Sequence, residues 1–136
     1  NTTMKHKFIG IALISIAAAL ATNSCCNAKS PQVEKFHGTE AYALMVAVND
    51  EDTARIKGIA NQHLYILNLS NLKDGEPAIA VAVQLDKFES FRALLNSGAD
   101  PNLSGFKAGT SATDYAKQRA SSGDTRYIDA INAMMR

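Results

Sequence analysis

The chain has 136 residues, 46% of them hydrophobic and 20% charged, which is enough for one globular domain and short for two. Its 14 basic and 13 acidic residues give a formal net charge of +1, without the basic surplus that a nucleic-acid-binding surface needs. We therefore expect no nucleic-acid partner.

Residues 1–21 have the pattern of a secretory signal peptide together with a few upstream residues. Lys5 and Lys7 precede an apolar stretch over 8–20, which is short for a transmembrane helix, and small residues at 19–21 suit cleavage by signal peptidase. A buried apolar helix is the alternative, which the charged start and the terminal position disfavour. Removing the two lysines from the 14 basic residues leaves 12 against 13 acidic ones. We predict an exported protein of the periplasm or envelope.

Cys25 and Cys26 are the two cysteines of the chain, and they follow this segment closely. Adjacent cysteines would form a strained ring and cannot staple a core. One interpretation is plain cleavage near Ala21. The other is that Cys25 is the lipid-modified first residue of a bacterial lipoprotein, which would be the only attachment to a membrane, although Thr22 stands where such signals usually carry Leu. Two thiols are too few for structural zinc, so no metal site is expected.

Residues 22–37 are polar around Pro31 and predict a tether. The folded domain is expected over 38–136.

This domain repeats itself with a period of about 34 residues. NLSNLKDG at 68–75 matches NLSGFKAG at 102–109 in five of eight positions, and the offset of 34 continues into 109–116. Further upstream, residues 44–60 align with 79–95 at an offset of 35. A fixed period of this length is the mark of a repeat protein.

Apolar residues at helical spacing predict a pair of helices in each repeat. The expected inner helices lie near 41–48, 77–84 and 111–119, and the expected outer helices lie near 51–60, 87–96 and 125–135.

Helix starts are expected at polar capping residues. Asp50, Asp86 and Ser111 are predicted to accept hydrogen bonds from free amides, and Glu89 and Asp114 are predicted to complete capping boxes. The apolar run from Leu64 to Leu69 is strand-like instead, and it could serve as core, edge strand or interface.

The repeat resembles the ankyrin family. Leu94, Leu95, Gly98, Ala99, Asp100 and Asn102 stand in its LLxxGADxN pattern, and 109–116 is close to GxTPLDYA. The tetratricopeptide family, which has a similar period, expects a Trp that this chain lacks. The resemblance implies an all-α solenoid of helix-turn-helix repeats joined by short β-turn fingers. The first repeat departs from it at 63–66, where His-Leu-Tyr-Ile replaces Gly-Ala-Asp-x.

No nucleophile, base and orienting group converge in the sequence, so we expect no enzyme and no cofactor. His63 is interpreted as a helix C-terminal residue, and the acidic residues at 50–52 as the start of a helix.

Ankyrin repeats bind other proteins through finger tips and inner helices, and the resemblance carries that role to one set of residues here. The set is Lys73, Asp74, Glu76, Gln84, Lys107, Thr110, Gln118 and Arg119. Tyr65, Leu72 and Phe106 are candidate apolar anchors. The alternatives are packing of finger against finger for Leu72 and Phe106, and plain solvation for the charged residues.

The sequence thus favours a protein-binding module exported to the bacterial envelope, with a protein partner that it does not identify. By family analogy, such a module could have an immunity or protection role. The alternative is an envelope-tethered structural protein without a specific site.

Overall fold

A computed structural model describes residues 28–105 and 110–135 of the chain. Seven α-helices and one 3-10 helix lie in these ranges, and no strand longer than a single bridge does. The predicted all-α class is therefore confirmed for this part of the chain. The expected signal peptide, Cys25, Phe106 and Lys107 lie outside the described residues.

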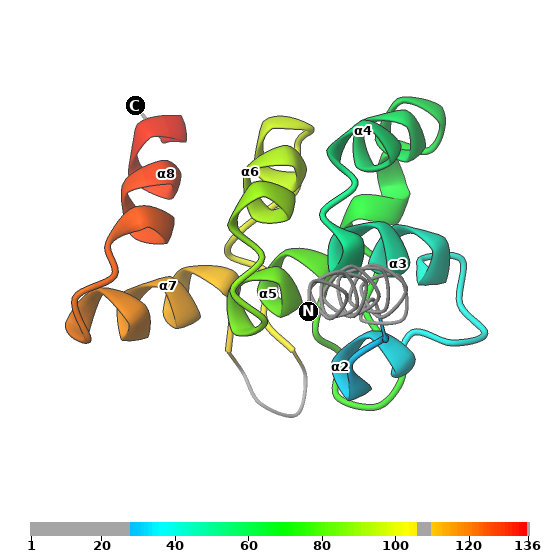
Figure 1. The fold of residues 1–136 in the computed structure, drawn as a ribbon, viewed down its shortest axis with the longest axis horizontal. Coiled ribbons are helices and arrows are strands. Elements are labelled where there is room, and N and C mark those ends of the chain that lie inside the picture. The colour runs from blue at the N-terminus through cyan, green and yellow to red at the C-terminus, as the bar shows by residue number, and fades with distance from the viewer. Residues whose placement is uncertain (1–27, 106–109, 136) are drawn as a thin grey trace, which may run out of the picture.

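Six of the helices form three consecutive pairs (Figure 1). Each predicted helix is present to within about two residues at either end. The inner helices contact one another in chain order, and so do the outer helices. The pairs are α3 (Tyr42–Asp50) with α4 (Thr53–Gln62), α5 (Ala78–Gln84) with α6 (Phe88–Asn96), and α7 (Ala112–Ser121) with α8 (Arg126–Met134).

The period of the sequence reappears in the backbone. Ser70 with Pro77, and Ser104 with Ser111, form single antiparallel β-bridges at an offset of 34 residues. Glu51 and Asp86, at an offset of 35, have the two positive φ angles found at described residues other than glycine, 53° and 56°. Equivalent positions in the aligned sequence therefore adopt equivalent local geometry.

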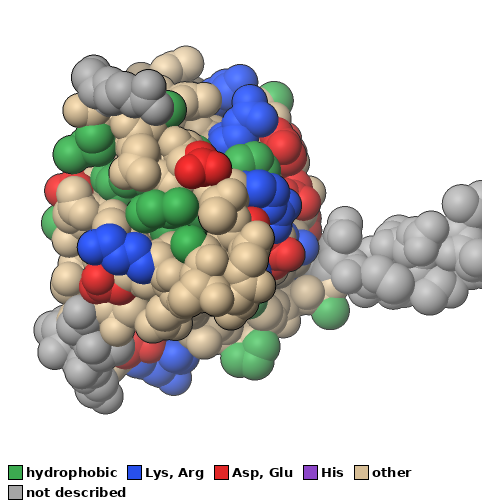
Figure 2. Space-filling view, turned by 90° about the vertical axis from the view of Figure 1, so that its left-hand side faces the viewer, with side chains coloured by type: hydrophobic (Ala, Val, Ile, Leu, Met, Phe, Trp, Pro, Cys, Tyr) green, Lys and Arg blue, Asp and Glu red, His purple; other side chains and the backbone are tan. Residues whose placement is uncertain are grey.

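The core is densest around α5, the middle inner helix. Its residues from Ala78 to Val83 are all fully buried, because α3, α7 and α6 cover it on three sides. The core continues through Phe91 and Leu94 of α6 to Tyr127 of α8. At the α7–α8 end of the molecule, charged, polar and hydrophobic side chains are mixed on the surface without one continuous apolar patch (Figure 2).

Only one of the three predicted helix caps is correct. Ser111 caps α7, and Asp114 completes the capping box. Asp50 is instead the last residue of α3, and Asp52 caps α4 by accepting from the Arg55 amide at 3.1 Å. Asp86 does not cap α6 either, since its backbone turns with positive φ before the helix starts.

An amide in the first turn of α6 donates a hydrogen bond to a residue that is distant in the sequence. The carboxylate of Glu51 accepts a hydrogen bond from the Glu89 amide at 3.0 Å. Because Glu51 follows α3 directly, this bond joins the end of one inner helix to the start of the next outer helix.

The predicted tether needs a correction in its described part. α2 (Pro31–Glu34) starts at the capping residue Ser30 and packs against α3. Val33 and Phe36 are fully buried in the common core. The folded unit therefore begins near residue 30, because these two apolar side chains cover the first inner helix.

The outer helices α4 and α6 end differently, as the sequence indicates. α6 is closed by Gly98 at a φ of 109°, and its amide donates to the Leu95 carbonyl at 3.2 Å. In the equivalent place α4 ends at His63, confirming its expected helix-end position, and continues into the 3-10 helix η1 (Leu64–Asn68). The apolar run is therefore helical, with Ile66 and Leu67 in the core and Leu64 exposed.

Candidate functional site

The first candidate feature is the loop over residues 70–77, called here the first finger, which lies before α5. Its centre is Asn71, whose side chain is 1% exposed. Asn71 Oδ1 accepts from the amides of Lys73 and Asp74, both at 2.8 Å, and its Nδ2 donates to Asp74 Oδ1 at 2.6 Å. One buried amide side chain thus holds most of the turn in a single conformation.

The tip of the first finger carries Leu72 and Lys73. Leu72 is 80% exposed, and Lys73 is also exposed. The finger does approach the next one, since a Cβ built on Gly105 would lie 2.8 Å from the Asp74 carbonyl oxygen. Phe106, the expected packing partner of Leu72 in the next finger, lies outside the described residues, so the alternative of finger-to-finger packing stays open.

Asp74 links the first finger to the end of α2. Lys35 Nζ donates to Asp74 Oδ2 at 2.7 Å. Partial burial alone would raise the pKa of Asp74, but the hydrogen bonds from Lys35 and Asn71 lower it below its usual range. Asp74 is therefore ionised at neutral pH, and its carboxylate already accepts hydrogen bonds from Lys35 and Asn71 of the same chain.

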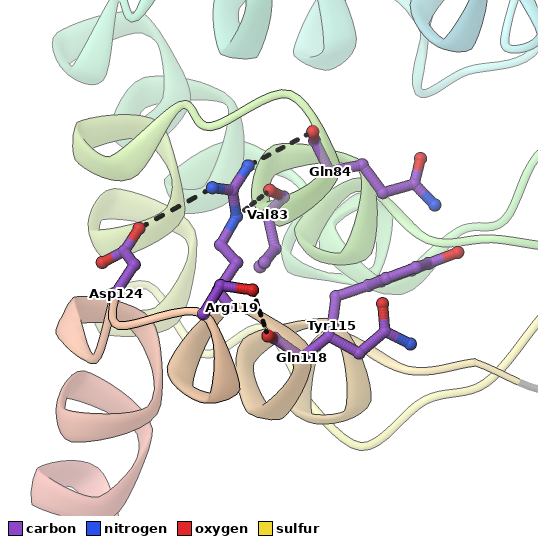
Figure 3. A pocket seen from close by; sticks show the side chains of 7 residues that line it. Val83, Gln84, Tyr115, Gln118, Arg119 and Asp124 are labelled. Carbon is purple, nitrogen blue, oxygen red and sulfur yellow. Dashed lines mark hydrogen bonds and ion pairs between the residues drawn. The ribbon is translucent and has the colours of Figure 1, made fainter.

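The second candidate feature is an open pocket of about 390 Å³, called here the α5–α7 pocket (Figure 3). It lies beside the C-terminal ends of the two inner helices. Its lining residues are Val83, Gln84, Tyr115, Gln118, Arg119, Ser122 and Asp124.

Glu76 lies directly behind the wall of this pocket. Its side chain is 3% exposed, and its carboxylate accepts hydrogen bonds from Gln84 Nε2 at 2.7 Å and from the hydroxyl of Tyr115. Burial and this contact with Glu76 raise the pKa of Tyr115 to about 12, so the phenol is a proton donor at neutral pH.

The guanidinium of Arg119 forms hydrogen bonds and an ion pair with other residues of the chain. Its Nε donates to the Val83 carbonyl at 2.9 Å and its NH2 group to the Gln84 carbonyl at 3.4 Å (Figure 3). These carbonyls belong to the last turn of α5, and the Val83 carbonyl also accepts from the Asp86 amide at 3.2 Å. The guanidinium also lies 3.7 Å from the carboxylate of Asp124. Arg119 therefore caps the C-terminal end of α5 and forms one side of the pocket.

The structure brings together only some of the residues predicted to bind a partner. Gln84, Gln118 and Arg119 line one pocket, and Glu76 stands behind it. Lys73 and Asp74 lie on the first finger, and Thr110 is half-buried just before α7.

Sequence reasoning missed Asn71, Tyr115 and Asp124. Asn71 begins an Asn-x-x-Asp-Gly turn pattern, and Asp124 follows Gly123 before α8, so both have weak local signals. Tyr115 has none, because its role depends on a carboxylate 39 residues away.

Within the described residues, no helix is long and apolar enough to cross a membrane. No group of three or more His, Cys, Asp or Glu side chains in that part of the chain could hold a metal ion.

Comparisons of the chain with models of known protein families, with curated proteins and with solved structures gave no match. Function is therefore inferred from the internal repeat and from the surface of the molecule.

Proposed function

We propose that the chain is an ankyrin-like repeat module that binds another protein through its first finger and the neighbouring ends of its inner helices. Three consecutive helix pairs, contacts between like helices, and β-bridges at an offset of 34 residues support the ankyrin-like assignment. The mixed polar surface at the α7–α8 end is what the terminal unit of a repeat array needs.

The observation that carries the binding role is Leu72 at the tip of the first finger. Leu72 is 80% exposed, so its burial by a partner would be favourable because apolar surface is removed from water. The finger that presents it is already held by the buried Asn71, so little conformational entropy is lost on binding. A rigidly presented apolar side chain beside charged groups matches the apolar centre and polar rim of a protein interface.

The proposal includes export to the bacterial envelope, with cleavage near Ala21 or lipid attachment at Cys25, and it includes neither an enzymatic activity nor a cofactor. Residues 1–21 support export through their charge and apolar pattern alone. Mass spectrometry of the mature N-terminus would distinguish the two kinds of processing.

Cross-linking of the tagged protein in its native envelope, followed by mass spectrometry, tests the binding role. We expect one dominant partner that is lost in Leu72→Ser and in the charge reversal Lys73→Glu. Leu64→Ser is the matched control, since Leu64 is a 61% exposed leucine outside the finger. If no partner is found with folded, abundant protein, the envelope-tethered structural role becomes the better explanation. If both serine variants lose the partner equally, the first finger is not the binding surface.

A further inference from the structure

The first finger is joined to the segment that precedes the repeats. Figure 1 shows α2 beside the loop before α5, and Lys35, the residue that ends α2, donates from Nζ to Asp74 Oδ2 at 2.7 Å. The two side chains are only 29% and 17% exposed, so water and salt screen this ion pair less than they screen a pair on the open surface. One contact thus connects the N-terminal segment to the loop that presents Leu72.

The hydrogen bonds of the finger converge on Asp74. Its Oδ1 accepts from Asn71 Nδ2 at 2.6 Å and from the Glu76 amide at 3.1 Å. Asn71 in turn accepts from the amides of Lys73 and Asp74. Because both oxygens belong to one rigid carboxylate, a rotation of Asp74 away from Lys35 would also disturb its bonds to Asn71 and Glu76.

The position of Lys35 depends on whether α2 is docked. A helix of four residues is not stable alone, because nucleation of its first turn is unfavourable. α2 is held instead by Val33 and Phe36, which are fully buried where this segment packs against α3. Docking therefore brings Lys35 to the finger, and undocking would remove it.

We infer that α2 is a conformational clasp for the first finger: while α2 is docked, Lys35 holds Asp74, and the finger keeps the conformation that exposes Leu72. Coupling of this kind is reciprocal, so an ordered finger also stabilises the docked α2. The consequence for binding rests on the proposed function, because a partner would have to order a released finger again and would bind it more weakly. An ion pair without this role would contribute to overall stability and leave the order of the finger unchanged.

Amide hydrogen exchange measured by NMR tests the clasp without any partner. The amides of Lys73 and Asp74 are the readout, since both donate to Asn71 Oδ1 at 2.8 Å within the finger. Lys35→Met removes the charge and keeps an unbranched side chain, and we expect it to accelerate the exchange of both amides about tenfold. Lys29→Met is the matched control at an exposed lysine of the same segment, and it should leave the exchange unchanged.

A second variant releases α2 without changing either member of the ion pair. Val33→Ala removes part of a fully buried side chain and should also accelerate the exchange of the finger amides about tenfold. Ile131→Val, in the core of α8, controls for a general loss of stability and should leave that exchange unchanged. The amide of the buried Ala116 in α7 is the internal reference, and the finger amides must accelerate more than it does. If Val33→Ala does not fold, as judged by circular dichroism, Lys35→Met alone decides.

Unchanged exchange of the finger amides in Lys35→Met or in folded Val33→Ala, or an equal acceleration at Ala116, would overturn the inference. That failure is separate from a failure of the proposed function. A partner that depends on Leu72 while Lys35→Met leaves the finger amides unchanged would leave protein binding intact. Accelerated exchange without any partner would leave only the clasp.

Discussion

Single polar side chains decide where elements begin in this protein. Ser111 accepts from the Asp114 amide at 3.2 Å, and Asp114 accepts from the Ser111 amide at 3.1 Å, so two free donors of α7 are satisfied. This box could be predicted because its partners are three residues apart. The bond from the Glu89 amide to Glu51 could not, because 38 residues separate them.

Ser111→Ala should lower the free energy of unfolding by about 1 kcal/mol, because the start of α7 loses its side-chain acceptor. Urea denaturation followed by circular dichroism measures the change. Ser121→Ala, at the exposed end of the same helix, is the control and should stay within about 0.5 kcal/mol of the wild type. Equal effects of the two changes would show that the capping box does not stabilise α7.

Acid should destabilise the protein through a cluster of carboxylates between α5 and α8. A hydrogen bond from the Tyr127 hydroxyl and the nearby Arg119 and Arg126 lower the pKa of Asp86. Hydrogen bonds from Arg126 lower the pKa of Asp124 to about 2. The unfolded chain, whose Asp pKa is near 3.8, therefore takes up protons first as the pH falls.

The stability contributed by these groups should be complete above about pH 4 and should decline as the pH falls towards about 2. Urea denaturation at a series of acidic pH values measures this slope. Asp124→Asn should flatten it, whereas Asp129→Asn, at an exposed position of α8, should not. A slope that Asp124→Asn leaves unchanged would contradict the assignment.

At the scale of elements, helical spacing located all six paired helices, but the N-terminal segment was misjudged. Val33 and Phe36 are two apolar residues in a short polar stretch, and a helix of four residues leaves no periodic pattern. Their burial depends on the side of α3 that α2 covers, which no pattern within this short stretch records.

Phe36→Ala should lower the free energy of unfolding by about 3–5 kcal/mol, since a fully buried aromatic side chain leaves a cavity. Thermal or urea denaturation provides the measurement. Lys29→Ala, an exposed position just before α2, is the control and should have little effect. A Phe36→Ala variant as stable as the wild type would restore the tether interpretation for this segment.

At the scale of the whole molecule, a residue's place in the row of helix pairs determines its environment. Ala43 of α3 and Ala78 of α5 occupy equivalent repeat positions at an offset of 35. Ala78 is fully buried where α3, α6 and α7 surround α5, whereas Ala43 is exposed. Equivalence in sequence therefore does not imply equivalence in burial.

Ala78→Leu should destabilise the protein by about 1–3 kcal/mol through overpacking, and Ala43→Leu should be tolerated. Because both changes add the same side chain to the same repeat position, the difference in unfolding free energy isolates the effect of the neighbouring pair. Equal destabilisation would contradict the difference in burial between the two positions.

The sequence by itself determined the period, the helices and the closing glycine at Gly98, because these depend on residues within one or two turns of each other. Lys73 and Asp74 of the first finger, together with Gln84 and Glu76, were predicted to bind a partner. The surface roles of these residues were a matter of family resemblance and still await the experiments above.

Only the tertiary structure decided which polar groups are already occupied and where a pocket forms. Arg119 donates to the Val83 carbonyl 36 residues away, and Tyr115 donates to Glu76 across 39 residues. Such contacts arise when separate helix pairs pack together, and no local pattern records which of the available partners a long side chain will reach.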